Sequence, residues 1–249
     1  MENIKKYIPL IILAVGVLIL ILSLVLFKKK SAGVVQLEVN EEENLAEIPF
    51  EDRPFASLIP SKDGHWLKLK VENIKTKASS VDYEILYQLP DGRTQGVPGT
   101  IKITEPNFER DILLGSESSG KYRYDEGVKS GTLTLKFRDD KGKLISKLST
   151  AFNLFSETKE LNFSDGKFSY LLDDLPKGVY FVVMETFGVN SKPDFEIVSG
   201  PYGVFASVDK KFTGKVVLDS DGIYYLQDDS WMKLDSGRSP NIGIFSSGK

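Results

Sequence analysis

Apolar and polar residues alternate at every second position in several short segments after Pro54. In HWLKLKVENI (65–74), Leu67, Leu69 and Val71 alternate with charged residues, and SVDYEILYQL (80–89) repeats the pattern. Such alternation gives one apolar and one polar face, which is typical of a half-buried β-strand. No segment after Lys30 shows a helical period over more than two turns. We therefore expect an all-β body.

Turn residues separate these segments at short intervals. GTLTLKFRDDKGKLISKLS (131–149) predicts a hairpin that reverses at DDKG, and Asp-Gly pairs, which tolerate the positive φ of tight turns, recur along the chain. These pairs are Asp63-Gly64, Asp91-Gly92, Asp165-Gly166 and Asp221-Gly222. Short strands at such regular spacing predict sandwich or barrel domains.

We expect two tandem immunoglobulin-like β-sandwich domains, at residues 54–157 and 158–249. Their boundary falls near SETK (156–159), where the first run of strands ends in polar residues. Residues 31–53 precede them and contain three consecutive glutamates, Glu41 to Glu43. Mutual repulsion keeps such a segment solvated and extended, so we interpret it as an acidic linker.

Residues 8–27 form an uncharged, mostly aliphatic segment with lysines at both ends. As a helix, twenty residues span about 30 Å, the thickness of the hydrocarbon core of a bilayer. The segment is longer than the apolar core of a cleavable signal peptide and lacks a small-residue cleavage site. Residues 1–30 are therefore expected to form a tail and an uncleaved single-pass signal-anchor.

The orientation of this anchor is not decided by charge alone, because basic residues flank both ends. The short N-terminal tail and the strand-rich body both favour a C-terminal part outside the cytoplasm. We predict a cell-membrane protein whose domains are extracytoplasmic, with a cytoplasmic body as the alternative.

Composition argues against several functions. The chain has no cysteine, which rules out disulfides, thiolate metal sites and a cysteine nucleophile. After Lys30 it carries 27 Lys and Arg against 34 Asp and Glu, with no basic cluster. Nucleic-acid binding needs such a cluster, so no nucleic-acid partner is expected.

LNFSDGKFSYLLDDLPKGVYFVVMETFG (161–188) contains Gly178, Val179 and Tyr180 shortly after Leu175 and Pro176. This stretch resembles the penultimate hairpin of bacterial immunoglobulin-like and collagen-adhesin B-type modules, in which a Gly-x-Tyr begins a strand. The resemblance covers about 25 residues and implies a fold class rather than an activity.

Motifs with possible chemistry are incomplete. His65 is the single histidine, which leaves no catalytic triad or two-histidine zinc site, and we interpret it as the residue at the start of a strand. LDSGRS (234–239) resembles the Asp-Ser-Gly loop of aspartic peptidases, but it has Arg238 next and no partner loop, so a polar turn is expected.

Acidic motifs are interpreted in the same way. DSDG (219–222) begins like a calcium loop but lacks the downstream glutamate, which favours a hairpin turn over weak calcium binding. The pairs Asp173-Asp174 and Asp228-Asp229 put neighbouring carboxylates on opposite strand faces, unlike a glycosidase pair. We predict no catalytic residue, no metal site and no cofactor.

The best binding candidates are Tyr224, Tyr225 and Trp231, on a predicted hairpin in GIYYLQDDSWMKL (222–234). Exposed aromatic residues on a β-face can stack on sugars or peptides, but Trp and Tyr are also common core residues in small sandwiches, and burial is the more frequent outcome.

These observations favour a non-enzymatic binding, adhesion or structural role in the cell envelope. The expected partners are the lipid bilayer, through residues 8–27, and an envelope protein or glycan, with edge-strand addition as one route. The alternative is a glycan-acting envelope enzyme of the jelly-roll type.

Overall fold

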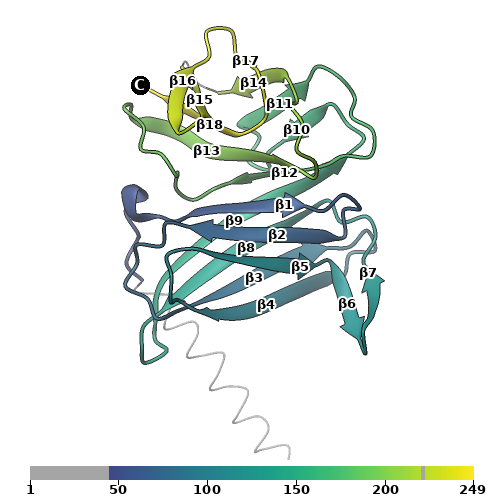
Figure 1. Cartoon of the computed structure of the whole chain (residues 1–249), viewed down its shortest axis with the longest axis vertical. Helices are drawn as coiled ribbons and strands as arrows, with labels where there is room; N and C mark the ends of the chain where they lie inside the picture. The colour runs from purple at the N-terminus through teal and green to yellow at the C-terminus, as the bar shows by residue number, and fades with distance from the viewer. Residues whose placement is uncertain (1–44, 220–221) are drawn as a thin grey trace, which may run out of the picture. The chain divides into compact units, whose positions relative to one another are not determined.

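The computed structural model describes residues 45–219 and 222–249, and in them the all-β prediction is confirmed (Figure 1). One 3-10 turn, η1 (Phe50–Asp52), precedes the strands. The first nine strands are β1 (Phe55–Pro60), β2 (Trp66–Glu72), β3 (Ser80–Gln88), β4 (Thr94–Lys102), β5 (Phe108–Leu113), β6 (Gly115–Ser118), β7 (Lys121–Tyr124), β8 (Ser130–Arg138) and β9 (Leu144–Ser156). The rest are β10 (Glu160–Asn162), β11 (Phe168–Leu172), β12 (Tyr180–Glu185), β13 (Ile197–Ala206), β14 (Gly214–Leu218), β15 (Ile223–Gln227), β16 (Ser230–Lys233), β17 (Arg238–Ser239) and β18 (Ile244–Gly248).

All strand pairs in the described residues are antiparallel, and they form four sheets. A three-stranded sheet has the order β1-β2-β5, and a four-stranded sheet has the order β10-β11-β14-β17. A nine-stranded sheet has the order β16-β15-β18-β13-β12-β9-β8-β3-β4, and β6 and β7 form a separate hairpin.

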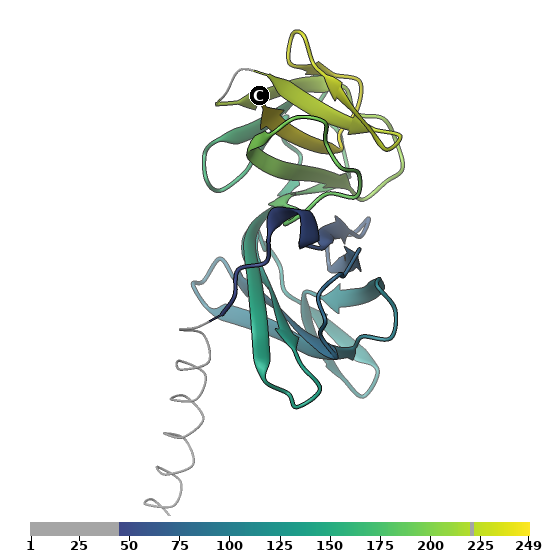
Figure 2. The same cartoon turned by 90° about the vertical axis from the view of Figure 1, so that its left-hand side faces the viewer.

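The first core lies between the three-stranded sheet and one half of the nine-stranded sheet. Alternate residues of β2 and β8 point into it, as the sequence pattern predicts: Leu67, Leu69, Val71, Leu133, Leu135 and Phe137. All of these side chains are fully buried, and each contributes roughly 1.5–3 kcal/mol to folding. The two facing layers of sheet are those of a β-sandwich (Figure 2).

The second core is aromatic and lies between the four-stranded sheet and the other half of the nine-stranded sheet. Phe168 on β11 stacks on Tyr202 of β13 at 4.9 Å and lies 5.8 Å from the ring of Phe245 on β18. Offset and tilted ring pairs of this kind contribute beyond the area they bury. The two cores thus share one sheet.

β9 connects the two cores, because it pairs with β8 over Leu144–Asn153 and with β12 over Phe152–Ser156 (Figure 1). Residues 46–249 form one compact unit. Ile48, which falls within the predicted linker, is buried in the first core. The domain boundaries at residues 53 and 157 remain predictions.

The predicted turns follow the expected chemistry. Gly64, Gly92, Gly166 and Gly222 all have positive φ, between 74° and 91°. The hairpin at 131–149 is β8–β9, and Gly142 N–H donates to the Asp139 carbonyl at its tip.

The predicted membrane anchor at residues 8–27 and most of the acidic linker lie outside the described residues. Within residues 45–219 and 222–249, no helix has the length and apolarity needed to cross a bilayer.

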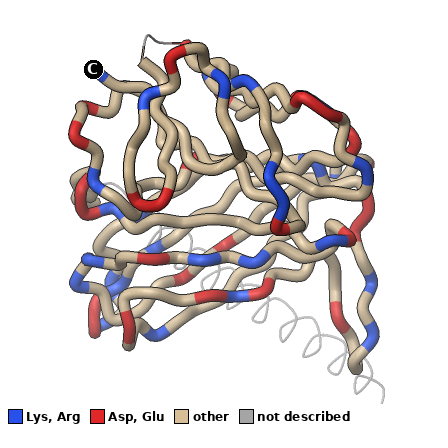
Figure 3. Tube along the Cα trace, turned by 45° about the horizontal axis from the view of Figure 1, so that its top comes forward, with Lys and Arg blue, Asp and Glu red and all other residues tan. Residues whose placement is uncertain are grey.

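Lys and Arg residues are interspersed with Asp and Glu over the described chain (Figure 3). On the outer face of the first sheet, for example, Lys68 on β2 lies 3.1 Å from Asp111, and Lys70 lies 2.7 Å from Glu109, both acids on β5. These pairs are exposed, so each contributes little to stability.

Candidate functional site

Four aromatic side chains gather where the β6–β7 hairpin meets the start of β2. We call His65, Trp66, Tyr122 and Tyr124 the aromatic row. The ring of Tyr124 stacks on His65 with centroids 4.3 Å apart, and the rings of Tyr122 and Tyr124 are nearly parallel at 6.3 Å. Trp66 meets Tyr122 edge-on at 5.5 Å.

The position of the row follows from strand geometry. Tyr122 and Tyr124 are two residues apart on β7, so their side chains lie on the same face of the hairpin. His65 is the residue before β2, as predicted, and Trp66 is the first residue of that strand.

The two tyrosines are unusually accessible. Tyr122 is 48% exposed and Tyr124 is 38% exposed, while every residue of β7 is exposed. Single exposed apolar residues are common, but a cluster of exposed aromatic rings is a typical feature of an interaction surface.

The base of the hairpin is fixed to the first core. Leu114 is buried, and its N–H donates to the His65 carbonyl at 2.8 Å. The buried Tyr87 donates its hydroxyl to Asp125 Oδ2 at 2.9 Å. Burial, together with that carboxylate, raises the pKa of Tyr87, which therefore stays a neutral donor. The base of the hairpin is thus held by buried side chains and hydrogen bonds.

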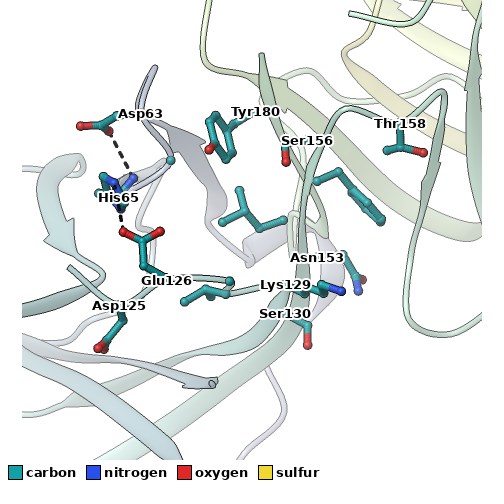
Figure 4. Close-up of a pocket in the computed structure, with 15 residues that line it drawn as sticks. Asp63, His65, Asp125, Glu126, Lys129, Ser130, Asn153, Ser156, Thr158 and Tyr180 are labelled. Carbon is teal, nitrogen blue, oxygen red and sulfur yellow. Dashed lines mark hydrogen bonds and ion pairs between the residues drawn. The ribbon is translucent and has the colours of Figure 1, made fainter. Parts of the chain in front are cut away.

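A pocket of about 530 Å³ opens beside the His65 end of the row (Figure 4). It lies between the two cores, and its wall comes from the 63–65 turn, the 125–130 segment, the end of β9 and the start of β12. Pockets of this size, located where two packed units meet, commonly bind small ligands.

Tyr180 forms an aromatic side of this pocket and depends on a neighbouring glycine. Gly64 has φ +74°, and a Cβ at that position would lie 2.3 Å from the Tyr180 ring. Any larger residue at position 64 would displace the ring, so the Asp63-Gly64 turn shapes the pocket as well as reversing the chain.

Carboxylates form the opposite side. Asp63 accepts hydrogen bonds from the Ser61 hydroxyl at 2.5 Å and from the His65 N–H at 3.2 Å. The Ser61 hydroxyl lowers the pKa of Asp63, so this group remains anionic. Glu126 Oε1 lies 3.9 Å from His65 Nε2 (Figure 4).

The residues predicted to bind a partner do not form a single surface. Tyr225 is only 6% exposed and packs on Phe245 in the second core at 5.2 Å. Tyr224 and Trp231 lie on the other face of the β15–β16 hairpin, which is confirmed as a hairpin. Their binding role remains a prediction.

Tyr224 and Trp231 contact the loop between β12 and β13. Phe195 of this loop stacks on Tyr224 at 3.7 Å and meets Trp231 edge-on at 5.5 Å. Trp231 Nε1 also donates to the Ser191 carbonyl at 2.9 Å. These aromatic faces therefore hold a loop of the same chain.

The acidic and Asp-Ser-Gly motifs have structural partners. Residues 234–237 form the turn between β16 and β17, and Arg238 donates to both oxygens of Asp173, at 2.8 and 2.7 Å. The Thr213 hydroxyl and Arg238 lower the pKa of Asp173. In the described residues, no group of three or more His, Cys, Asp or Glu is placed to hold a metal ion.

Sequence reasoning missed the aromatic row. The signal in KYRY was two aromatics alternating with charged residues on a segment without any other apolar residue. Their contact with His65 and Trp66 joins residues almost sixty positions apart, which no local pattern reveals.

Comparisons with family models, with curated proteins and with solved structures found no match for this chain.

Proposed function

We propose that the chain is a single-pass membrane protein, anchored by residues 8–27, whose body lies outside the cytoplasm and binds a component of the cell envelope. The anchor and its orientation rest on the sequence. The binding role rests on one observation above all, the aromatic row with its two accessible tyrosines.

The row has the properties of a recognition surface. Aromatic side chains offer large contact areas with few rotatable bonds, so they lose little entropy when a partner covers them. Here the rings already hold one another in position, which reduces that cost further. A binding, adhesive or structural role accounts for such a surface without requiring chemistry.

Strand order supports an immunoglobulin-like fold for the first core. The sheet β1-β2-β5 faces the order β9-β8-β3-β4, which corresponds to strands A, B and E against G, F, C and an added edge strand. The order β12-β13-β18-β15-β16 around the second core differs from this arrangement, so for that part we propose only a β-sandwich.

A glycan-acting enzyme is the second candidate, because the pocket combines an aromatic ring with carboxylates. Asp63, Asp125 and Glu126 all lie on one side of it (Figure 4). A glycosidase needs two carboxyl groups on either side of the scissile bond, one of them with a raised pKa. The test is release of reducing ends from envelope polysaccharide. If the wild-type protein releases them and the Glu126→Gln variant does not, the enzyme is favoured.

The binding proposal is tested with the full chain in lipid nanodiscs and with isolated cell envelopes. We expect the double variant Tyr122→Ala/Tyr124→Ala to lose most of its envelope binding in a co-sedimentation assay, because two stacking surfaces are removed at sites that do not support the core. Leu175→Ala, which truncates another exposed apolar side chain, is the matched control.

Equal binding by the wild type and the double variant would contradict the role of the row. The topology is tested separately by protease treatment of intact cells that carry a tag after Lys249. A tag that survives until lysis would reject the extracytoplasmic placement.

A further inference from the structure

We propose that the pocket beside the aromatic row binds a sugar unit bearing a free, positively charged amine, within a glycan whose neighbouring units lie on the row. This inference rests on the proposed function and specifies the chemistry of its partner.

The size and the apolar surface of the pocket fit a sugar ring. About 530 Å³ is within the range of small-ligand sites, and Tyr180 provides a flat ring against which the C–H face of a sugar can stack. Val128 and Leu154 also line the pocket and add apolar surface, and both are buried in the first core. The apolar part of the site is therefore built into the fold.

Hydroxyl and amide groups line the side opposite the carboxylates. Ser156 lies near Tyr180, Thr158 lies further along the wall, and Lys129, Ser130 and Asn153 lie together below Ser156 (Figure 4). The Asn153 side-chain oxygen accepts from the Ser164 hydroxyl at 2.7 Å, which orients its amide. Short polar groups around an aromatic ring match the hydroxyl groups that surround the ring of a sugar.

The charges of the lining select an amine. Three carboxylates, of Asp63, Asp125 and Glu126, are opposed by one ammonium group, that of Lys129. Asp125 Oδ2 accepts a hydrogen bond from the Tyr87 hydroxyl, and its carboxylate points away from Tyr180 (Figure 4), so Asp125 contributes negative charge to this side of the pocket. An ammonium group on the ligand offers several donors and a positive charge to these carboxylates, whereas an acetylated amine offers one uncharged N–H and an acidic sugar is repelled.

Because the pocket is continuous with the aromatic row, we expect the ligand to be an oligosaccharide rather than a single free sugar. His65 lines the pocket and also stacks on Tyr124, so the pocket and the row meet at this side chain. A glycan that leaves the pocket at His65 reaches Tyr124 and then Tyr122. A lysine-rich peptide shares the positive charge but offers no ring for Tyr180.

The test uses the full chain in nanodiscs and measures binding to three probes by calorimetry: a glucosamine hexasaccharide, its N-acetylated counterpart and hexalysine. We expect the glucosamine probe to bind most tightly, with an affinity that falls as salt rises. Glu126→Gln is expected to weaken that binding about fivefold, the effect of losing one partly exposed ion pair. Glu105→Gln, the same change at an exposed position outside the pocket, should leave it unaltered.

Each other result overturns the inference. Equal affinity for the acetylated probe, with no effect of Glu126→Gln, rejects the charge selection. Tighter binding of hexalysine rejects the glycan. If no probe binds while envelope binding still depends on Tyr122 and Tyr124, the inference fails and the proposed function stands. If no probe binds and envelope binding does not depend on Tyr122 and Tyr124 either, both the inference and the proposed function are rejected.

Discussion

Glu185 is a half-buried carboxyl group for which the structure provides no hydrogen-bond donor among the described residues. It lies on β12 opposite Tyr202, whose hydroxyl donates instead to Asp165 Oδ2 at 2.7 Å. Burial, and then the negative charge of Asp165, raise the pKa of Glu185, while Lys167 and Arg53 offset part of this effect. The folded state therefore retains the Glu185 proton to a higher pH than the unfolded state.

We predict that Glu185→Gln stabilises the protein at pH 7 by roughly 1 kcal/mol or less. The folded-state pKa is raised, so the wild type loses stability as pH rises from the unfolded pKa, about 4.3, through the folded one. The gain of the variant should vanish below about pH 4, where both states are protonated. Urea unfolding from pH 3.5 to 7.5 measures it, and a gain independent of pH would contradict this account.

At the scale of the element, β4 is the free edge of the nine-stranded sheet. Ile103 N–H donates to the Ser79 carbonyl, so alternate residues of β4, including Val97 and Gly99, bond inward to β3. Pro98 occupies an outward position, where its missing N–H breaks the row of donors that another strand would use. The proline makes this edge unsuitable for strand addition.

We predict that Pro98→Val promotes self-association, because it restores an outward N–H in a nine-residue edge strand. Sedimentation velocity over a concentration series measures the effect. Thr94→Val is the control. It adds the same valine side chain at another outward position of β4, but position 94 already has a backbone N–H, so no donor is added. If both variants associate equally, apolar surface rather than the donor is responsible.

At the scale of the whole folded unit, the loop between β12 and β13 contacts both cores. Asn190 Nδ2 donates to Glu72 Oε2 at 3.2 Å, next to the first core, while Phe195 and Ser191 pack on the β15–β16 hairpin of the second. Ala56 N–H also donates to the Thr186 carbonyl at 2.9 Å. These contacts and the shared sheet join the two cores within one compact unit, residues 46–249, so we expect it to unfold in a single transition.

We predict that Trp231→Ala lowers the free energy of unfolding by about 2 kcal/mol, because it removes a ring contact and leaves the Ser191 carbonyl without its donor. Chemical unfolding followed by circular dichroism should still show a single transition. Met232→Ala, its exposed neighbour, should change stability by less than about 0.5 kcal/mol.

The same variant separates two roles for Trp231. If Trp231→Ala retains full stability but loses envelope binding, the residue binds the partner directly, as the sequence suggested. If it loses stability but retains envelope binding below its unfolding temperature, Trp231 holds the loop.

The sequence alone determined the strands and most turns, because these depend on neighbouring residues. A period of two decides which side chains of one strand share a face, as in Leu67, Leu69 and Val71, and Asp-Gly pairs supply the positive φ that turns require. The β15–β16 turn is less regular in sequence, since Asp228 and Asp229 both have positive φ without a glycine. Its position was still predictable from the strands on either side.

The tertiary structure decided which faces meet. Alternation separates Tyr224 from Tyr225 but does not say which one enters the core, and it cannot place Tyr124 against His65 or Tyr180 against Gly64. Those contacts depend on sheet order and on how two layers pack, which are interactions between residues distant in the chain. The class of fold was therefore present in the local pattern, whereas the aromatic row and the pocket arose only from long-range packing.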